Sequence, residues 1–178
     1  MIEMEYKAVV DKDRFDELRN MLQAECGQPM QILQVNYYYD DENNTLNNHN
    51  ITLRVRQADG VLTLQRKIHC AEKELFVISD ENESVLRSLP KMIRGKYTLK
   101  GSLITQRLRF TLDSLCVDFD ANYYLGVCDY EIELEFDESA AEQAQRYISL
   151  LGAGGALHKR GKSLRFFERL REYTYEQA

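Results

Sequence analysis

Strict alternation of apolar and charged residues is the main pattern along this chain of 178 residues. It is clearest at the start, where Glu3, Glu5 and Lys7 alternate with Met4 and Tyr6. Because successive side chains of a β-strand point to opposite faces, this spacing predicts a strand with its charged residues on one face. Two carboxylates on one face could hold a divalent cation, but an ordinary sheet with one wet face has the same alternation. The first strand alone does not decide between the two.

Five later segments repeat the alternation, and each carries charge of a single sign on its polar face. The basic faces hold Thr52, Arg54 and Arg56, then Thr63, Gln65 and Lys67, then Thr105, Arg107 and Arg109, and the acidic faces hold Asp118 and Asp120, then Glu131, Glu133 and Glu135. Like charges on one face repel each other, whereas a merely solvated face usually mixes both signs. The sorting therefore favours a polar lumen, where acidic and basic strands bind a polyanion with divalent cations. An open sheet facing water is the alternative.

Turn signals divide the alternating runs into about eight strands. Asp59 and Gly60 lie between two alternating runs and predict a β-hairpin. The segment 96–111 is interpreted as two strands and 127–136 as one long strand. Strands joined mostly by short turns, with helices between some of them, predict an antiparallel barrel or sandwich.

Helical patterns lie between the strands. Asp11 can cap a helix over roughly 12–25, and a second helix is expected over about 138–151. A short helix is also expected after Ser79 or Asp80.

The composition is that of a globular protein with one domain. Apolar residues make up 44% of the chain and charged residues 29%, and 178 residues are enough for one sizeable core. A formal net charge of −6 argues against a nucleic-acid partner that is bound through general basicity.

Cysteine spacing and hydropathy bear on the compartment. Cys26, Cys70, Cys116 and Cys128 have no C-x-x-C spacing, so we expect free, mostly buried thiols instead of a zinc site or disulfides. The N-terminus has no signal-peptide pattern, and no apolar run is long enough to span a membrane. These features predict a cytoplasmic protein without a membrane partner.

Five ordered motifs resemble those of the CYTH superfamily, also called triphosphate tunnel metalloenzymes. They are E-x-E-x-K at Glu3, Glu5 and Lys7, R-x-R at Arg54 and Arg56, T-x-R at Thr105 and Arg107, Y-E-I-E-L-E from Tyr130 to Glu135, and a basic C-terminal segment with Lys159, Lys162 and Arg165. The resemblance spans about residues 1–170 and is greatest to the small single-domain members of Gram-positive bacteria.

The resemblance implies a mainly β, α+β fold. We expect a closed eight-stranded antiparallel β-barrel with flanking helices, which forms a tunnel as a single domain over residues 1–178. Members of the family bind triphosphates inside this tunnel with Mg²⁺ or Mn²⁺.

The family's functional residues can be carried over position by position. The expected metal ligands are Glu3, Glu5, Glu131, Glu133 and Glu135, with Asp118 as a further acid. The expected phosphate-binding residues are Lys7, Arg54, Arg56, Lys67, Arg107, Arg109, Lys162 and Arg165. Catalysis is assigned to Glu5, Glu133 and Lys7.

One position departs from the family pattern. Gln65 follows L-T-L, where the family usually has a lysine, and Lys67 lies two residues further on the same face. If Lys67 does not substitute, one phosphate contact is missing and catalysis is weak or absent.

Three functions remain open at this point. The first is metal-dependent hydrolysis of inorganic triphosphate or a small organic triphosphate, in which a second cation or an acid such as Glu133 positions the attacking water. The second is an adenylyl cyclase of the class IV type. The third is a non-catalytic module that binds polyphosphate or nucleotide.

Overall fold

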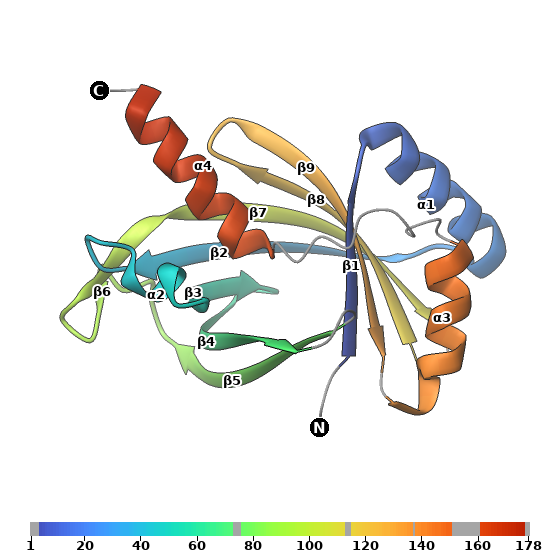
Figure 1. Cartoon of the computed structure of the whole chain (residues 1–178), viewed down its shortest axis with the longest axis horizontal. Helices are drawn as coiled ribbons and strands as arrows, with labels where there is room; N and C mark the ends of the chain where they lie inside the picture. The colour runs from blue at the N-terminus through green and yellow to red at the C-terminus, as the bar shows by residue number, and fades with distance from the viewer. Residues whose placement is uncertain (1–3, 73–75, 113–114, 137, 151–160, 177–178) are drawn as a thin grey trace.

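The computed structural model describes residues 4–72, 76–112, 115–136, 138–150 and 161–176, which form one antiparallel sheet with helices packed on it (Figure 1). The strands are β1 Met4–Val10, β2 Met30–Asp40, β3 Ile51–Ala58, β4 Val61–Glu72, β5 Phe76–Leu86, β6 Met92–Ile93, β7 Tyr97–Leu112, β8 Leu115–Tyr124 and β9 Val127–Phe136. The helices are α1 Lys12–Cys26, α2 Thr45–Asn48, α3 Ala141–Leu150 and α4 Lys162–Glu176, with a 3₁₀ turn at Glu138–Ala140. Among the described helices, none combines the length and apolar character that crossing a lipid bilayer requires.

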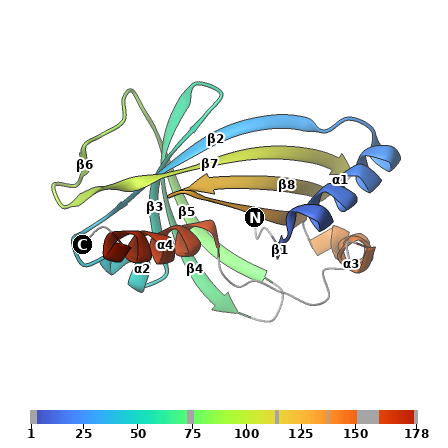
Figure 2. The same ribbon diagram turned by 90° about the horizontal axis from the view of Figure 1, so that it is seen from above.

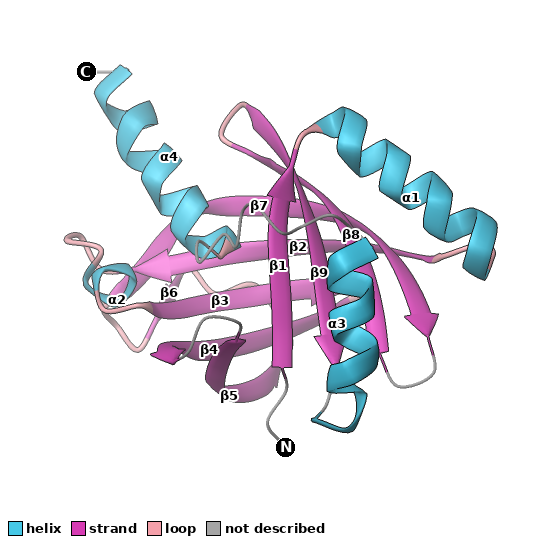
Figure 3. Cartoon of the chain, turned by 45° about the vertical axis from the view of Figure 1, so that its right-hand side comes forward, coloured by secondary structure: helices cyan, strands magenta, loops and turns pink. Residues whose placement is uncertain are grey.

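The sheet follows the strand order β1-β9-β8-β7-β2-β3-β4-β5, and the short β6 pairs with β7 outside this path. The strand directions turn through the sheet, so that β1 runs nearly crosswise to β2 (Figure 3). The edge strands β1 and β5 approach each other, with Cα atoms within 8 Å. No backbone ladder joins them among the described residues, so closure into a barrel is not confirmed. Closure depends on strand tilt and register around the ring, which alternation in a sequence does not encode.

The hairpin predicted at Asp59 and Gly60 is confirmed, since β3 and β4 pair across it. Both residues have positive φ, at 49° and 77°, as a two-residue hairpin turn of the favoured type requires.

Residues 97–112 form the single strand β7 and not two strands, because Gly101 lets the chain bend within one strand. The pairing of β7 with β2 shifts register at this point. Gly101 has a φ of 152°, and a Cβ placed there would lie 2.8 Å from Cζ of Phe166. A glycine is therefore required both by the backbone and by the neighbouring ring.

The prediction of a short helix after Ser79 or Asp80 is wrong. These residues belong to β5, where Ser79 pairs with His69 and Asp80 pairs with Ile68 of β4. The capping residues and a few apolar positions favour a helix locally, but pairing along the whole of β4 decides the conformation.

Helices α1 and α3 cover one face of the sheet near β8 and β9 (Figures 1 and 2). Asp11 caps α1 as predicted, because its carboxylate accepts a hydrogen bond from the Arg14 amide at 2.8 Å. Buried side chains from the two helices and the strands form the main core: Phe15, Leu18, Leu22, Ala144, Ile148, Phe119, Ile132 and Leu134. Apolar residues of β8 and β9 therefore face these helices, whereas Leu53 and Val55 of β3 form a separate buried cluster with Tyr39 and Ile93.

The opposite face of the sheet, here called the polar face, carries the charged members of the alternation. Helix α4 packs over it, at the end away from α1 and α3 (Figure 2). Phe166 and Phe167 of α4 form a second buried cluster with Tyr38, Leu103 and Tyr124. This packing fixes the N-terminal end of α4 beside the charged residues.

Of the four cysteines, Cys26 and Cys128 are exposed free thiols, and Cys116 is a part-buried one. The expectation of free thiols is confirmed for these three, whereas the expectation of burial is wrong for Cys26 and Cys128. The side chain of Cys70 lies outside the described residues.

Candidate functional site

The register of β1, β9 and β8 places acidic side chains next to each other on the polar face. Glu5 lies opposite Glu135, and Lys7 lies opposite Glu133. On the other side of β9, Glu133 lies opposite Asp118. Like charges in directly opposed positions destabilise a sheet unless cations compensate them. The polar face therefore depends on basic side chains from neighbouring elements.

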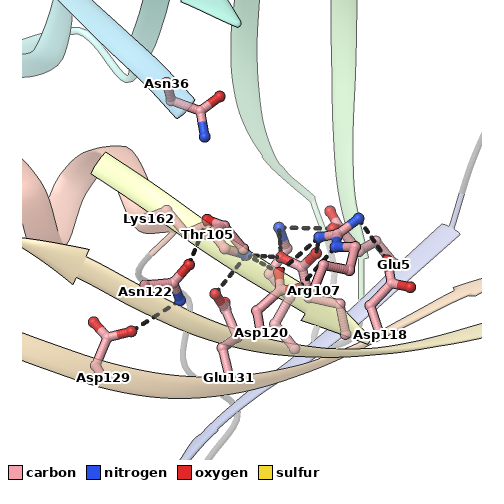
Figure 4. A network of polar contacts seen from close by, with 12 residues as sticks. Glu5, Asn36, Thr105, Arg107, Asp118, Asp120, Asn122, Asp129, Glu131 and Lys162 are labelled. Atoms are coloured by element: carbon pink, nitrogen blue, oxygen red, sulfur yellow. Dashed lines mark hydrogen bonds and ion pairs between the residues drawn. The ribbon is translucent and has the colours of Figure 1, made fainter. Parts of the chain in front are cut away.

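Two arginines of β7 supply part of this compensation. The Arg107 guanidinium donates to both oxygens of Asp120, at 2.8 and 2.7 Å, and its Nη2 also lies 2.5 Å from Oε2 of Glu133 (Figure 4). Arg109 holds Asp118 in the same two-bond manner, at 2.7 and 2.6 Å, and lies 2.7 Å from Glu135. Such paired bonds fix the orientation of both partners.

Two lysines add to the compensation of the acidic strands. Lys7 Nζ lies 2.7 Å from Glu5 Oε1 and 2.9 Å from Glu133 Oε1. Lys162, the first residue of α4, reaches the buried acids Asp120, Glu131 and Glu133. Glu133 is thus shared by Lys7, Lys162 and Arg107.

Arg165 of α4 bonds a further acid that sequence reasoning did not assign. Its guanidinium lies 2.8 Å from Asp129 and 2.9 Å from Glu131. Asp129 also accepts hydrogen bonds from the Tyr124 hydroxyl at 2.7 Å and from the Asn122 amide at 2.9 Å. No motif marks Asp129, and its role follows only from where α4 packs.

The basic strands β3 and β4 contribute a different environment. Arg54 Nε donates to Oε1 of Gln65 at 2.7 Å, and the Gln65 amide donates to Glu83. The Nε of Arg56 donates to Oδ1 of Asn36 at 3.2 Å, and no carboxylate of the described residues forms an ion pair with Arg56. Burial, with the nearby charges of Arg54 and Arg107, lowers the pKa of Arg56 to about 10.

Two buried donors beside Arg56 lack partners. The Asn36 amide nitrogen and the Tyr38 hydroxyl are fully buried and make no hydrogen bond within the described protein. Figure 4 shows the Asn36 side chain directed toward the acidic network from across the polar face. Sequence reasoning missed both residues, since a polar residue in a strand carries no sign of an unmet hydrogen bond. An arginine without an acid, beside unpaired donors, is an environment suited to an anion.

The carboxylates differ in how their charge is balanced. Burial would raise the pKa of Glu133, but Lys162, Lys7 and Arg107 hold it well below its usual range. Burial raises the pKa of Glu135 to about 7, with the neighbouring charge of Asp118 adding to the effect. Burial also raises the pKa of Asp118 in spite of Arg109. Glu133 is therefore ionised at neutral pH, while Glu135 lacks full compensation by cations.

Among the residues that the structure describes, two groups of acids each bring oxygen donors close enough to hold one metal ion. Glu5, Glu133 and Glu135 form the first group, and Asp120, Glu131 and Glu133 form the second. In each group the candidate oxygens lie within 4.8 Å of one another. Carboxylate oxygens suit hard cations such as Mg²⁺ and Mn²⁺, so these residues fit the expected metal.

The other residues predicted from the sequence are placed as follows. Asp118 is tied to Arg109 and Arg107 and belongs to neither group of acids. Lys67 is part-buried on β4, opposite Thr52 of β3. Glu3 and Lys159 lie outside the described residues.

Comparison with known proteins bears on the family and the fold. The sequence model of the CYTH domain matches residues 1–159. A candidate adenylate cyclase of Bacillus halodurans has a similar structure, with a TM-score of 0.73 and 22% identity over 93% of this chain and 97% of that one. The search of curated proteins gives no match.

Two further solved structures share the fold. The Hippeastrum protein HpAC1, a candidate adenylyl cyclase with a dominant triphosphatase activity, has a TM-score of 0.72 and 17% identity over 94% of this chain and 95% of that one. The PH1819 protein of Pyrococcus horikoshii has a TM-score of 0.65 and 16% identity over 94% of this chain and 99% of that one. At these identities the likeness shows the fold alone.

Proposed function

The chain belongs to the CYTH domain family, and on this premise we propose that it is a metal-dependent triphosphatase acting on inorganic triphosphate or a small organic triphosphate. One observation carries the proposal. A group of close carboxylates at Glu5, Glu133 and Glu135 shares the polar face with a basic side, where Arg56 forms no ion pair within the described residues. A phosphate chain with a divalent cation has the charges to satisfy both sides at once.

On the basic side, Arg54, Arg56 and Lys67 are the proposed first contacts with phosphate oxygens. A guanidinium offers a planar set of donors that matches phosphate geometry. The unpaired Asn36 amide and Tyr38 hydroxyl lie on the same side and strengthen the case for an anion there. The other predicted phosphate-binding residues already form ion pairs with carboxylates: Lys7, Arg107, Arg109, Lys162 and Arg165. If one of them also contacts a phosphate, its N–H donors are divided between that phosphate and the carboxylates.

On the acidic side, Glu5, Glu133 and Glu135 would hold Mg²⁺ or Mn²⁺, with Glu3 as a further proposed ligand. When bound, such a cation neutralises charge on phosphate oxygens and makes the phosphoanhydride more open to attack by water. The raised pKa of Glu135, caused first by burial, indicates that this group needs additional positive charge.

The chain's own part in the reaction is positioning and electrostatic stabilisation. The arginines orient the phosphate chain and neutralise charge that develops on the leaving diphosphate. Lys7 and Arg107 hold Glu133 in one orientation, so that the acidic group is formed before the substrate binds. No nucleophilic side chain is required.

Gln65 favours a second candidate, a non-catalytic module for polyphosphate or nucleotide. Its amide bridges Arg54 and Glu83, so a neutral side chain takes a central position among the basic residues. The basic side therefore lacks one charge that would help to neutralise a leaving phosphate.

Product analysis separates the candidate functions. The purified chain is incubated with inorganic triphosphate or with ATP, and with Mg²⁺ or Mn²⁺, and orthophosphate and cyclic AMP are both quantified. Metal-dependent orthophosphate release supports the hydrolase. Cyclic AMP as the main product of ATP contradicts it, and saturable triphosphate binding without turnover supports the module instead.

A further inference from the structure

A row of three hydrogen-bonded side chains crosses the polar face beside the ion pairs. Thr105 of β7, Asn122 of β8 and Asp129 of β9 occupy directly opposed positions in the sheet. The Thr105 hydroxyl donates to Oδ1 of Asn122 at 2.7 Å, and the Asn122 amide donates to Oδ1 of Asp129 at 2.9 Å (Figure 4). Thr105 and Asn122 are fully buried, so water does not substitute for either bond.

Asp129 ends this row and holds Arg165 of α4. Arg165 Nε donates to Oδ2 of Asp129 at 2.8 Å, and Nη2 donates to Oδ1 at 3.2 Å. The Tyr124 hydroxyl donates to Oδ2 at 2.7 Å. Burial would raise the pKa of Asp129, but the charge of Arg165 and these hydrogen bonds hold it below its usual range. The carboxylate that orients the guanidinium is thus itself oriented by Asn122 and Tyr124.

The direction of the Asn122 amide depends on both of its neighbours. An ionised Asp129 only accepts hydrogen bonds, so Asn122 turns its NH₂ group toward it. The amide oxygen then points to Thr105, which donates the hydrogen bond that this oxygen needs. Thr105 belongs to the T-x-R motif, and this contact gives its hydroxyl a place in the site.

Asp129 is set apart from the acids that could hold a metal ion. Within the described part of the chain, it belongs to neither group of close carboxylates. Glu131, which lies 2.9 Å from Nη2 of Arg165, belongs to one of them. A cation bound at Glu131 would compete with Arg165 for that carboxylate but not for Asp129. Asp129 can therefore keep Arg165 in place when a cation is bound.

Arg165 lies beside another predicted phosphate-binding residue. Arg165 and Lys162 both bond Oε2 of Glu131, at 2.9 and 2.7 Å. The N–H groups of a guanidinium lie in one plane, so its contact with a phosphate depends on how that plane is turned. The two bonds to Asp129 set the plane of Arg165.

We infer that Thr105, Asn122 and Asp129 position Arg165 for a phosphate oxygen of the substrate. This inference rests on the proposed function, with Arg165 as one of its phosphate-binding residues. Asp129 is then a positioning residue that acts through Arg165, and Thr105 acts through Asn122. A row that only fastened α4 to the sheet would add stability without any coupling to affinity.

A double-mutant cycle on Asp129 and Arg165 tests the inference without turnover. Isothermal titration calorimetry with Mg²⁺ measures the affinity for diimidotriphosphate, a triphosphate analogue whose bridging NH groups resist hydrolysis. We expect Asp129→Asn to weaken binding at least about fivefold in the wild type and to weaken it no further in Arg165→Met. Removal of a negative charge would by itself strengthen anion binding, so weaker binding identifies lost positioning. Unchanged or tighter binding by Asp129→Asn, or equal weakening with and without Arg165, would overturn the inference.

Thr105→Val changes no charge and covers the case in which Asp129→Asn does not fold. We expect about threefold weaker binding of the analogue, again only while Arg165 is present. Thr111→Val, at the exposed end of β7, is the control and should bind as the wild type does. A lower Tm of Thr105→Val with unchanged affinity would show that the row only fastens α4, and would overturn the inference.

The same titrations separate failure of the inference from failure of the proposed function. A wild type that does not bind the analogue contradicts the proposed function and the inference together. A wild type that binds it, with the same affinity as Arg165→Met, contradicts the inference alone.

Discussion

Lys7 of β1 stands directly opposite Glu133 of β9, and its Nζ lies 2.9 Å from the Glu133 carboxylate. The two residues are 126 positions apart in the chain, and the antiparallel register of the two strands brings them together. The pair joins the first charged strand to the acidic strand that carries most of the candidate metal ligands. Its loss should affect both the stability of the fold and the binding site.

Lys7→Met should destabilise the protein by about 2–4 kcal/mol, because it leaves Glu133 and Glu5 with less positive charge in a largely buried place. Urea unfolding measures the free energy of unfolding directly. Lys12→Met is the control, since Lys12 forms an exposed pair with Asp16 on α1 and lies 5.9 Å from the ring centre of Tyr130, and its removal should change stability by less than about 1 kcal/mol. Equal effects of the two substitutions would show that the Lys7–Glu133 pair has no special role.

Arg56→Met should weaken triphosphate binding at least about tenfold without destabilising the protein. Arg56 is part-buried and has no ion pair with a described carboxylate, and burial together with Arg54 and Arg107 lowers its pKa to about 10. The guanidinium has no carboxylate partner among the described residues and donates one hydrogen bond, to Asn36, so we expect its removal to change the free energy of unfolding by less than about 1 kcal/mol. Isothermal titration calorimetry and urea unfolding measure the two effects, with the exposed Arg87→Met as control. Marked destabilisation with unchanged affinity would assign Arg56 to the structure alone.

Glu135→Gln should stabilise the metal-free protein at pH 8.5 and have little effect at pH 5. The folded pKa of Glu135 is raised from 4.5 to about 7, first by burial and then by the charge of Asp118. The folded state therefore binds the carboxyl proton of Glu135 more tightly than the unfolded state does. The free energy of unfolding falls as pH rises from about 4.5 through about 7, because the unfolded state loses this proton first. A neutral glutamine avoids that loss, which we expect to be about 1–2 kcal/mol because the side chain is partly exposed.

Urea unfolding in EDTA at the two pH values gives the difference between wild type and Glu135→Gln. A difference that does not change with pH would contradict the raised pKa of Glu135.

Gly101→Ala should destabilise the protein by about 2–4 kcal/mol and disturb the packing of α4. The added Cβ would lie 2.8 Å from the Phe166 ring, and the backbone has a φ of 152°. Unfolding experiments measure the stability, and near-UV circular dichroism reports on the aromatic cluster of Phe166. Gly161→Ala is the matched control, because a Cβ there meets no atom within 4 Å and φ is not positive. A small effect of Gly101→Ala would mean that the Phe166 ring moves aside freely.

The charged faces of the strands could be predicted from the sequence because β-alternation is a local property. The alternation around Arg54, Arg107 and Glu133 was enough to place these residues on one polar face. The partner of each residue was not predictable, since pairing depends on strand register. Asp120 illustrates this limit. Its place on a polar strand face was evident from the sequence, but its bonds to Arg107 and Lys162 follow from the positions of β7 and α4.

Other features could not be predicted because they depend on contacts between distant segments. The segment around Ser79 shows a local helix signal, and only pairing with β4 makes it a strand. Barrel closure was expected, but no ladder of hydrogen bonds between β1 and β5 is found in the described part of the chain. The raised pKa of Glu135 and the unpaired donors of Asn36 and Tyr38 depend on burial, which periodicity does not measure.

The central claim is that the acids at Glu5, Glu133 and Glu135 serve a metal-dependent triphosphatase. Its most direct test is orthophosphate release from inorganic triphosphate, with Mg²⁺, Mn²⁺ or EDTA, by wild type, Glu5→Gln and the exposed control Glu25→Gln. We predict turnover that requires metal, a fall in kcat/KM of at least about 100-fold in Glu5→Gln, and wild-type activity in Glu25→Gln. Absence of turnover in the wild type, or equal activity of all three proteins, would contradict the claim.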